Sequence, residues 1–181
     1  IGCLVGSEMC IRDRAGGERE DAVALLEVAE ELDRQNANYK KWLGLLSLEM
    51  GDLVMALEYT NRSIELDPQD TSVYSQLGAI LNEMDDFDLA IKSYNAGLKV
   101  DPNDMRCRAG LASTLIKLGK LDEAKREIIE ANKKGGEEHP MVLSVSALID
   151  SFFGQKKEAL SKIQQVLTTE SSSLDILLLA H

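Results

Sequence analysis

Residues 71–104 read TSVYSQLGAILNEMDDFDLAIKSYNAGLKVDPND, and the same arrangement returns, with substitutions, on both sides of this stretch. The repeated landmarks are a Leu followed by a small residue (Leu43-Gly44, Leu77-Gly78, Leu111-Ala112), a central alanine (Ala56, Ala90, Ala124) and an Asp-Pro pair (Asp67-Pro68, Asp101-Pro102). The spacing is 34 residues, since 77 − 43 and 111 − 77 are both 34. A fixed period of roughly 20–50 residues is the signature of a protein built from stacked repeats.

Within each period the residues predict two helices. Leu43, Leu46 and Met50 lie at i, i+3 and i+7, which is one stripe of an α-helix, and we expect this stripe to face the core. The small residues at the Gly44 and Ala56 positions allow two helices to approach closely. Residues that tolerate the left-handed conformation stand where the first helix should end: Gly51, Asp85, Gly119 and Gly154.

A 34-residue period with Leu-Gly, a central Ala and a terminal Pro resembles the tetratricopeptide repeat (TPR). The resemblance implies an all-α fold, a right-handed superhelical solenoid of antiparallel helix pairs. It also implies a scaffold or adaptor that binds a protein or peptide segment in a concave groove lined by the first helix of each repeat. On this pattern we expect a partial repeat at 15–36, repeats at 37–70, 71–104, 105–138 and 140–172, and the start of another first helix in a partial repeat at 173–181.

The segment 1–14 fits none of these repeats. Residues 3–14 can be written in codons that resemble a transposon adapter used in sequencing libraries, so we exclude 1–14 from the fold as a non-native segment. The rest is then interpreted as a fragment of a longer array from an environmental read assembly, whose true N-terminus is missing. The compartment stays open on this interpretation, with the cytoplasm as the default. Cys107 is the one cysteine left, and a single thiol forms no internal disulfide.

Composition and charge narrow the class of partner. Aromatic residues make up only 4% of the chain, which favours helices packed by aliphatic side chains over a β-sandwich. The net charge of −11 repels phosphate backbones and anionic lipids, so we expect no nucleic-acid partner and no membrane partner. No apolar run approaches the roughly 20 residues that a bilayer-spanning helix needs, so no membrane insertion is expected.

No set of residues has the pattern of an enzyme active site, and we expect no enzyme activity, no cofactor and no metal. The histidines, His139 and His181, lie far apart and lack metal-ligand spacing. The stretch 85–88 (DDFD) lacks the later ligand and the Gly of a calcium loop, and we interpret it as a turn with a helix cap. Cys107 has no histidine near it in sequence and is interpreted as a small packing residue.

A second stripe on each first helix supplies the candidate binding site. It starts at Asn38 in the first repeat and lies on a different face from the packing stripe. The predicted peptide-binding groove consists of Asn38, Lys41, Leu45, Glu49, Ser75, Ala79, Asn82, Glu83, Arg106, Ser113 and Lys117. The small residues leave room for a peptide, and Glu49 and Glu83 would meet a basic residue of the partner. The carboxylate clamp of chaperone-binding TPRs is not expected, because Leu45 and Gly110 stand where that clamp needs Asn and Arg.

Several alternatives stay open at this point. The array could be the targeting arm of a larger enzyme, because TPR arrays precede glycosyltransferase and sulfotransferase domains; flanking sequence would decide. The groove could contact solvent alone. Trp42 could serve as an exposed anchor, although packing against the preceding helix is the interpretation we favour. Finally, exposed array ends predict self-association or fraying, because 173–181 is rich in Leu and has no second helix to cover it.

Overall fold

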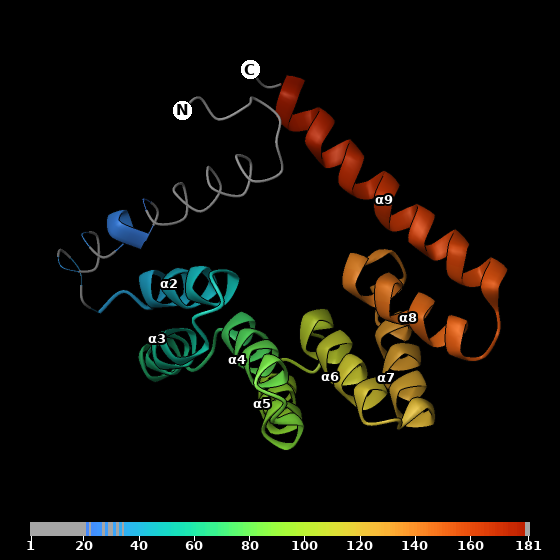
Figure 1. Cartoon of the computed structure of the whole chain (residues 1–181), viewed down its shortest axis with the longest axis horizontal. Coiled ribbons are helices and arrows are strands. Elements are labelled where there is room, and N and C mark those ends of the chain that lie inside the picture. Colours follow the sequence, from blue (N-terminus) through green and yellow to red (C-terminus); the bar gives the residue numbers. More distant parts are fainter. Residues whose placement is uncertain are drawn as a thin grey trace, which may run out of the picture.

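The computed structural model is a solenoid of helices that follow one another in pairs (Figure 1). It describes residues 21, 23–26, 28, 31, 33 and 35–179 and, within the last helix, side chains up to Thr168. The elements in chain order are α2 (Ala37–Glu49), α3 (Leu53–Leu66), α4 (Thr71–Glu83), α5 (Phe87–Val100), α6 (Met105–Lys117), α7 (Leu121–Lys133), the short 3-10 helix η1 (Gly136–Glu138), α8 (Pro140–Phe152) and α9 (Lys156–Leu179).

Helices joined by short turns pack against each other, α2 with α3, α4 with α5, α6 with α7, and α8 with α9. Each first helix also contacts the first helix of the next pair, from α2 to α4, α6 and α8. No strand occurs in the described part of the chain. The expected all-α solenoid of TPR-type helix pairs is therefore confirmed.

The helices begin at polar residues that recur with the same period. Asn36, Asp70 and Asp104 precede α2, α4 and α6, and each side chain accepts a hydrogen bond from a backbone amide of the helix it precedes, at 3.1, 2.9 and 2.8 Å. Asp52 and Asp86 cap α3 and α5 in the same way. Such caps satisfy amides that have no partner inside the helix, so the period in sequence sets the period of helix starts.

Each first helix ends in a left-handed residue, as expected. The backbone φ angle is +80° at Gly51, +59° at Asp85, +74° at Gly119 and +77° at Gly154. Asp85 is the one non-glycine residue in this conformation among the described residues. Since an L-residue with a Cβ is strained there, the turn between α4 and α5 holds a small unfavourable energy that the other turns avoid.

We expect Asp85→Gly to raise the free energy of unfolding by about 0.5–1 kcal/mol, because relief of the left-handed strain exceeds the entropy that glycine adds to the unfolded chain. Urea unfolding followed by circular dichroism measures the change. Gly119→Ala, at the equivalent turn one repeat later, is the matched control and should lower the free energy of unfolding. An Asp85→Gly protein no more stable than the parent would contradict the assignment of strain to this turn.

Between successive helix pairs, one side chain of a second helix inserts against two first helices. Tyr94 of α5 lies between Gly78 of α4 and Gly110 of α6, and a Cβ placed on either glycine would collide with its ring. The Tyr94 side chain is buried, and burial raises the pKa of its hydroxyl. Gly78 and Gly110 are therefore small because a ring occupies the space that their side chains would fill.

The same place is filled differently one repeat earlier. Thr60 stands 34 residues before Tyr94, and Gln76 stands 34 residues before Gly110. The Gln76 amide donates to the Thr60 hydroxyl at 3.1 Å, and a Cβ on Gly44 would lie 2.6 Å from that hydroxyl. In the earlier repeat, the smaller Thr60 and the longer Gln76 together occupy the place that Tyr94 and Gly110 occupy one repeat later. The space between the helix pairs is therefore filled in both repeats.

We expect Gly110→Ala to lower the free energy of unfolding by roughly 1–3 kcal/mol, because the new methyl group overpacks against the Tyr94 ring. In a Tyr94→Leu background the same change should become neutral or stabilising, since alanine is the better helix former by about 1 kcal/mol. A double-mutant cycle in urea measures this coupling. An equal cost of Gly110→Ala in both backgrounds would show that the ring is not the cause.

Two sequence-based expectations need correction. Met50 is exposed, as are its counterparts Met84 and Leu118, because this position is the C-cap at the end of the first helix. The buried residues of α2 are Leu43, Gly44 and Ser47. A new first helix at Ser173 is also not observed, because α9 continues unbroken from Lys156 to Leu179. The sequence between Gln155 and the end of α9 contains neither Gly nor Pro, so nothing interrupts the helix.

The adapter-like segment 1–14 and most of the partial repeat 15–36 lie outside the described residues.

Candidate groove on the first helices

Two adjoining hollows open on the face formed by the first helices. The first has a volume of about 370 Å³ and is lined by residues of α2, α4, α6 and α8 together with Tyr94; we call it the Trp42 hollow. The second has a volume of about 690 Å³ and extends along α4, α6 and α8 to Val166 of α9; we call it the Glu83 hollow. Leu48, Ala79, Tyr94 and Met141 line both hollows, which therefore form one continuous groove.

Most of the predicted groove residues line this surface. The Trp42 hollow includes Lys41, Leu45, Ser75, Ala79 and Arg106. The Glu83 hollow includes Ala79, Asn82, Glu83, Ser113 and Lys117. Asn38 and Glu49 line neither hollow. Whether a ligand uses these residues stays a prediction.

Sequence reasoning missed the apolar side of the groove. Tyr94 belongs to a second helix, yet its ring passes between α4 and α6 and forms part of the floor. Met141 and Val145 of α8 and Val166 of α9 also line the Glu83 hollow. The predicted groove was defined from the first three repeats only. The α8 and α9 residues were missed because the fourth repeat departs most from the repeat pattern. The curvature of the solenoid brings them to the same face.

Trp42 lines the hollow that we name after it, and its side chain is 51% exposed. The contact that we favoured from the sequence would involve residues 21–34, many of which lie outside the described residues. An indole half-exposed in a hollow offers a large, rigid apolar contact area together with an N–H donor. Trp42 therefore joins the candidate site as its main aromatic residue.

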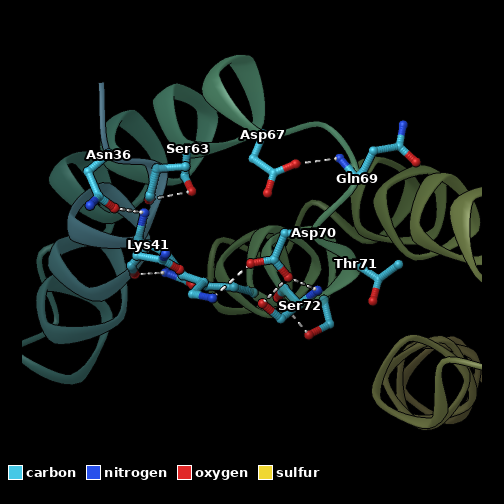
Figure 2. A network of polar contacts seen from close by, with 12 residues as sticks. Asn36, Lys41, Ser63, Asp67, Gln69, Asp70, Thr71 and Ser72 are labelled. Atoms are coloured by element: carbon cyan, nitrogen blue, oxygen red, sulfur yellow. Dashed lines mark hydrogen bonds and ion pairs between the residues drawn. The ribbon is translucent and has the colours of Figure 1, made fainter. Parts of the chain in front are cut away.

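The first basic residue of the groove is already paired. Figure 2 shows Lys41 reaching from α2 to Asp70 at the start of α4, where its Nζ donates to Oδ2 at 2.7 Å. The backbone amide and the hydroxyl of Ser72 donate to the other carboxylate oxygen at 2.9 and 2.5 Å. Burial opposes ionisation of Asp70, but these hydrogen bonds outweigh it and hold the pKa of the carboxyl below its ordinary value. Lys41 thus joins two repeats and offers a ligand little free charge.

The other cations of the groove also have neighbours. Arg106 Nη2 lies 3.5 Å from Asp104 Oδ2, and Lys117 Nζ lies 5.8 Å from the centre of the Phe87 ring. By contrast, Glu83 is exposed and makes no ion pair within the described part of the chain. The groove therefore presents a carboxylate that a basic ligand could reach, beside an apolar floor.

Asn82 differs from the other predicted groove residues because it is buried. Its Nδ2 donates to the Thr114 hydroxyl at 2.9 Å and to the Tyr94 hydroxyl at 3.3 Å. The Thr114 hydroxyl in turn donates to the Gly110 carbonyl at 2.9 Å. This network ties α4, α5 and α6 together under the groove, so Asn82 supports the floor and is not available to a ligand.

We expect Asn82→Ala to lower the free energy of unfolding by roughly 1–3 kcal/mol, because it leaves the buried Tyr94 hydroxyl without its partner. Chemical unfolding measures the loss. Ser113→Ala is the control, since Ser113 lines the groove but has no place in this network, and its effect should stay within about 0.5 kcal/mol. Equal effects of the two changes would place Asn82 among ordinary surface residues.

Cys107 is a packing residue, as the sequence predicted. Its side chain is fully buried and lies against Gly97, where an added Cβ would come within 2.5 Å of the sulfur. Burial, followed by the negative charge of Asp104, raises the pKa of the thiol to about 12. A thiol that stays protonated at neutral pH is not a nucleophile. No group of metal-binding side chains occurs among the described residues, and no described helix is long and apolar enough to cross a bilayer.

The arrangement of the helices places the chain among the helical-repeat solenoids, with a continuous groove on its first helices. The family model of the tetratricopeptide repeat matches residues 81–149. These residues are therefore assigned to tetratricopeptide repeats, and the chain has the fold of a TPR solenoid. None of the curated proteins matches it.

Solved structures share the fold at low sequence identity. A thermophilic TPR protein of Thermus thermophilus superposes with a TM-score of 0.74 at 20% identity, covering 93% of this chain and 91% of that protein. MamA superposes with a TM-score of 0.63 at 16% identity, covering 94% and 99%. YrrB, described as a TPR protein with an unusual peptide-binding site, superposes with a TM-score of 0.56 at 18% identity, covering 86% and 79%. Identities this low establish the shared fold alone.

Proposed function

We propose that the chain is a protein–protein interaction module that binds a protein or peptide segment in the groove on its first helices. The observation that carries this proposal is the groove itself, a continuous surface with an apolar floor that crosses α2, α4, α6 and α8. The peptide-binding site named for YrrB, which shares the fold, supports the same kind of ligand.

The shape of the groove favours a segment of chain over a small molecule. The two hollows follow one another across successive repeats, and both are open to solvent. Ala79, Ser75 and Ser113 keep the space above α4 and α6 clear. An extended or helical peptide can place side chains at intervals along such a surface, with apolar anchors against Trp42 and Met141.

The charges of the groove favour a ligand with a basic residue. Lys41 and Arg106 face carboxylates of the protein itself, whereas Glu83 lines the groove without an ion pair in the described part. The net charge of −11 adds a long-range attraction for cations. We therefore propose that a Lys or Arg of the ligand meets Glu83; Glu49, which was paired with it in the sequence-based prediction, lies outside both hollows.

The test starts from peptides selected against the full chain from a displayed library. Glu83→Lys should weaken the Kd of the selected peptides roughly tenfold or more, because it replaces attraction of a basic residue by repulsion. Lys92→Glu, an exposed charge reversal on α5, is the control and should leave Kd nearly unchanged. Isothermal titration calorimetry measures both. If Lys92→Glu is the more harmful change, the ligand binds outside the groove.

A further inference from the structure

The first helices differ in chemistry from one repeat to the next, and one row of equivalent residues shows this most clearly. The offsets along the row are 34, 34 and 35 residues, since 83 − 49 and 117 − 83 are both 34 and 152 − 117 is 35. From α2 to α8 the row consists of Glu49, Glu83, Lys117 and Phe152. Helix α4 contacts α6, and α6 contacts α8 (Figure 1). An acidic, a basic and an apolar residue therefore follow one another across α4, α6 and α8.

The fourth repeat supplies most of the apolar lining of the Glu83 hollow. Met141 and Val145 of α8 and Val166 of α9 line this hollow, whereas α4 contributes the carboxylate of Glu83. Phe152 follows Met141 by 11 residues, which is three turns of helix, so the two lie on the same face of α8. The Phe152 side chain is 59% exposed and that of Met141 44% exposed. Helix α8 thus presents large apolar side chains where α4 presents a charge.

The exposure of these side chains is a property of their positions in the repeat. Lys117 and Arg106 are the counterparts of Phe152 and Met141 in the third repeat, and both are exposed although α8 packs beside α6. Glu83 is exposed although α6 packs beside α4. These positions therefore stay open in repeats that another repeat follows. A phenylalanine at a position that carries a charge on α2, α4 and α6 offers a ligand a large apolar contact area.

The charge on α6 restricts where a basic residue of a ligand can lie. Lys117 lines the Glu83 hollow, and neither Lys117 nor Glu83 makes an ion pair among the described residues. A Lys or Arg of the ligand is therefore attracted to Glu83 on α4 and repelled from Lys117 on α6. An apolar side chain of the ligand gains most on α8, where contact with Phe152 and Met141 removes apolar surface from water.

We propose that the ligand is a segment with a basic residue at one end and a large apolar residue at the other, and that it crosses the groove from α4 to α8. The basic residue meets Glu83, and the apolar residue meets Phe152 and Met141. This inference rests on the proposed function and adds to it the order of the ligand's residues. Neighbouring helices pack about 8–10 Å apart, so the two ends lie about 16–20 Å apart. An extended segment covers this distance in about five or six residues, and a helix in about 11–13.

Peptides selected against the full chain, from a displayed library long enough for either spacing, test this order. We expect them to share a Lys or Arg and, at a fixed spacing from it, a large apolar residue. Phe152→Glu should raise their Kd roughly tenfold or more, because it removes the apolar contact. Replacing the apolar residue of the peptide by Lys should restore binding to this variant, which a purely structural role of Phe152 does not explain. Ile129→Glu is the control, since Ile129 is 44% exposed on the second helix α7, and it should leave Kd unchanged.

Isothermal titration calorimetry with Glu83→Lys separates this inference from the proposed function. If Glu83→Lys weakens binding and Phe152→Glu does not, or if the Lys peptide fails to restore binding, the groove binds the ligand but the inferred order is wrong. The order is also wrong if Phe152→Glu alone weakens binding. If neither change weakens binding, or no peptide is selected, both proposals fail. Circular dichroism checks folding, and Met141→Glu with the same peptides takes the place of Phe152→Glu if that variant loses helix content.

Discussion

The rest of the structure depends on how one side chain of each second helix fits between two successive first helices. Three sets of equivalent residues occupy this place along the solenoid: Gly44, Thr60 and Gln76; Gly78, Tyr94 and Gly110; and Ala112, Ile128 and Val145. In the first two sets, a Cβ on the glycine would meet the inserted residue, and in the third, Ile128 is buried in the main core with Val145 packed against that core. Each set fills the space between two layers with different residues, so that the layers stay closely packed. The 34-residue period thus reflects a packing constraint between layers as much as the length of each helix.

The same contact contributes both to stability and to the shape of the groove on the first helices. Because Tyr94 passes through the layer, its ring lines both hollows of the groove, and its hydroxyl accepts a hydrogen bond from Asn82, which is itself bonded to Thr114. These hydrogen bonds join α4, α5 and α6 under the floor of the groove, which restricts the rearrangement of that floor. The ion pair between Lys41 and Asp70 has a related effect, since it fixes α2 against the start of α4 at one side of the groove. Residues that a sequence pattern assigns to ligand binding can thus serve mainly to hold the repeats together.

Local features of the fold could be predicted from the sequence, whereas contacts between repeats could not. The helix cap in the stretch 85–88 and the left-handed turns depend on a few neighbouring residues, and the structure has them where they were expected. The stripe through Met50 was wrong because the helix ends one residue earlier than the periodicity assumed. The burial of Asn82 and the role of Tyr94 depend on partners 12 and 32 residues away in sequence, which periodicity within one helix does not reveal. The length of α9 follows from the absence of Gly and Pro after Gln155, a signal that the repeat pattern obscured.

The most direct test of ligand binding on the first helices is to map a bound peptide by NMR on the isotope-labelled chain. A peptide selected against this protein should perturb amides of α4, α6 and α8, with the largest shifts near Ala79 and Ser113 and a change at the Trp42 indole. Those amides line a groove that continues across the repeats, so the perturbed residues should form one surface. Perturbations confined to the outer helices α3, α5 and α7, with α4 and α6 unchanged, would contradict the claim that this protein binds its ligand on the first helices.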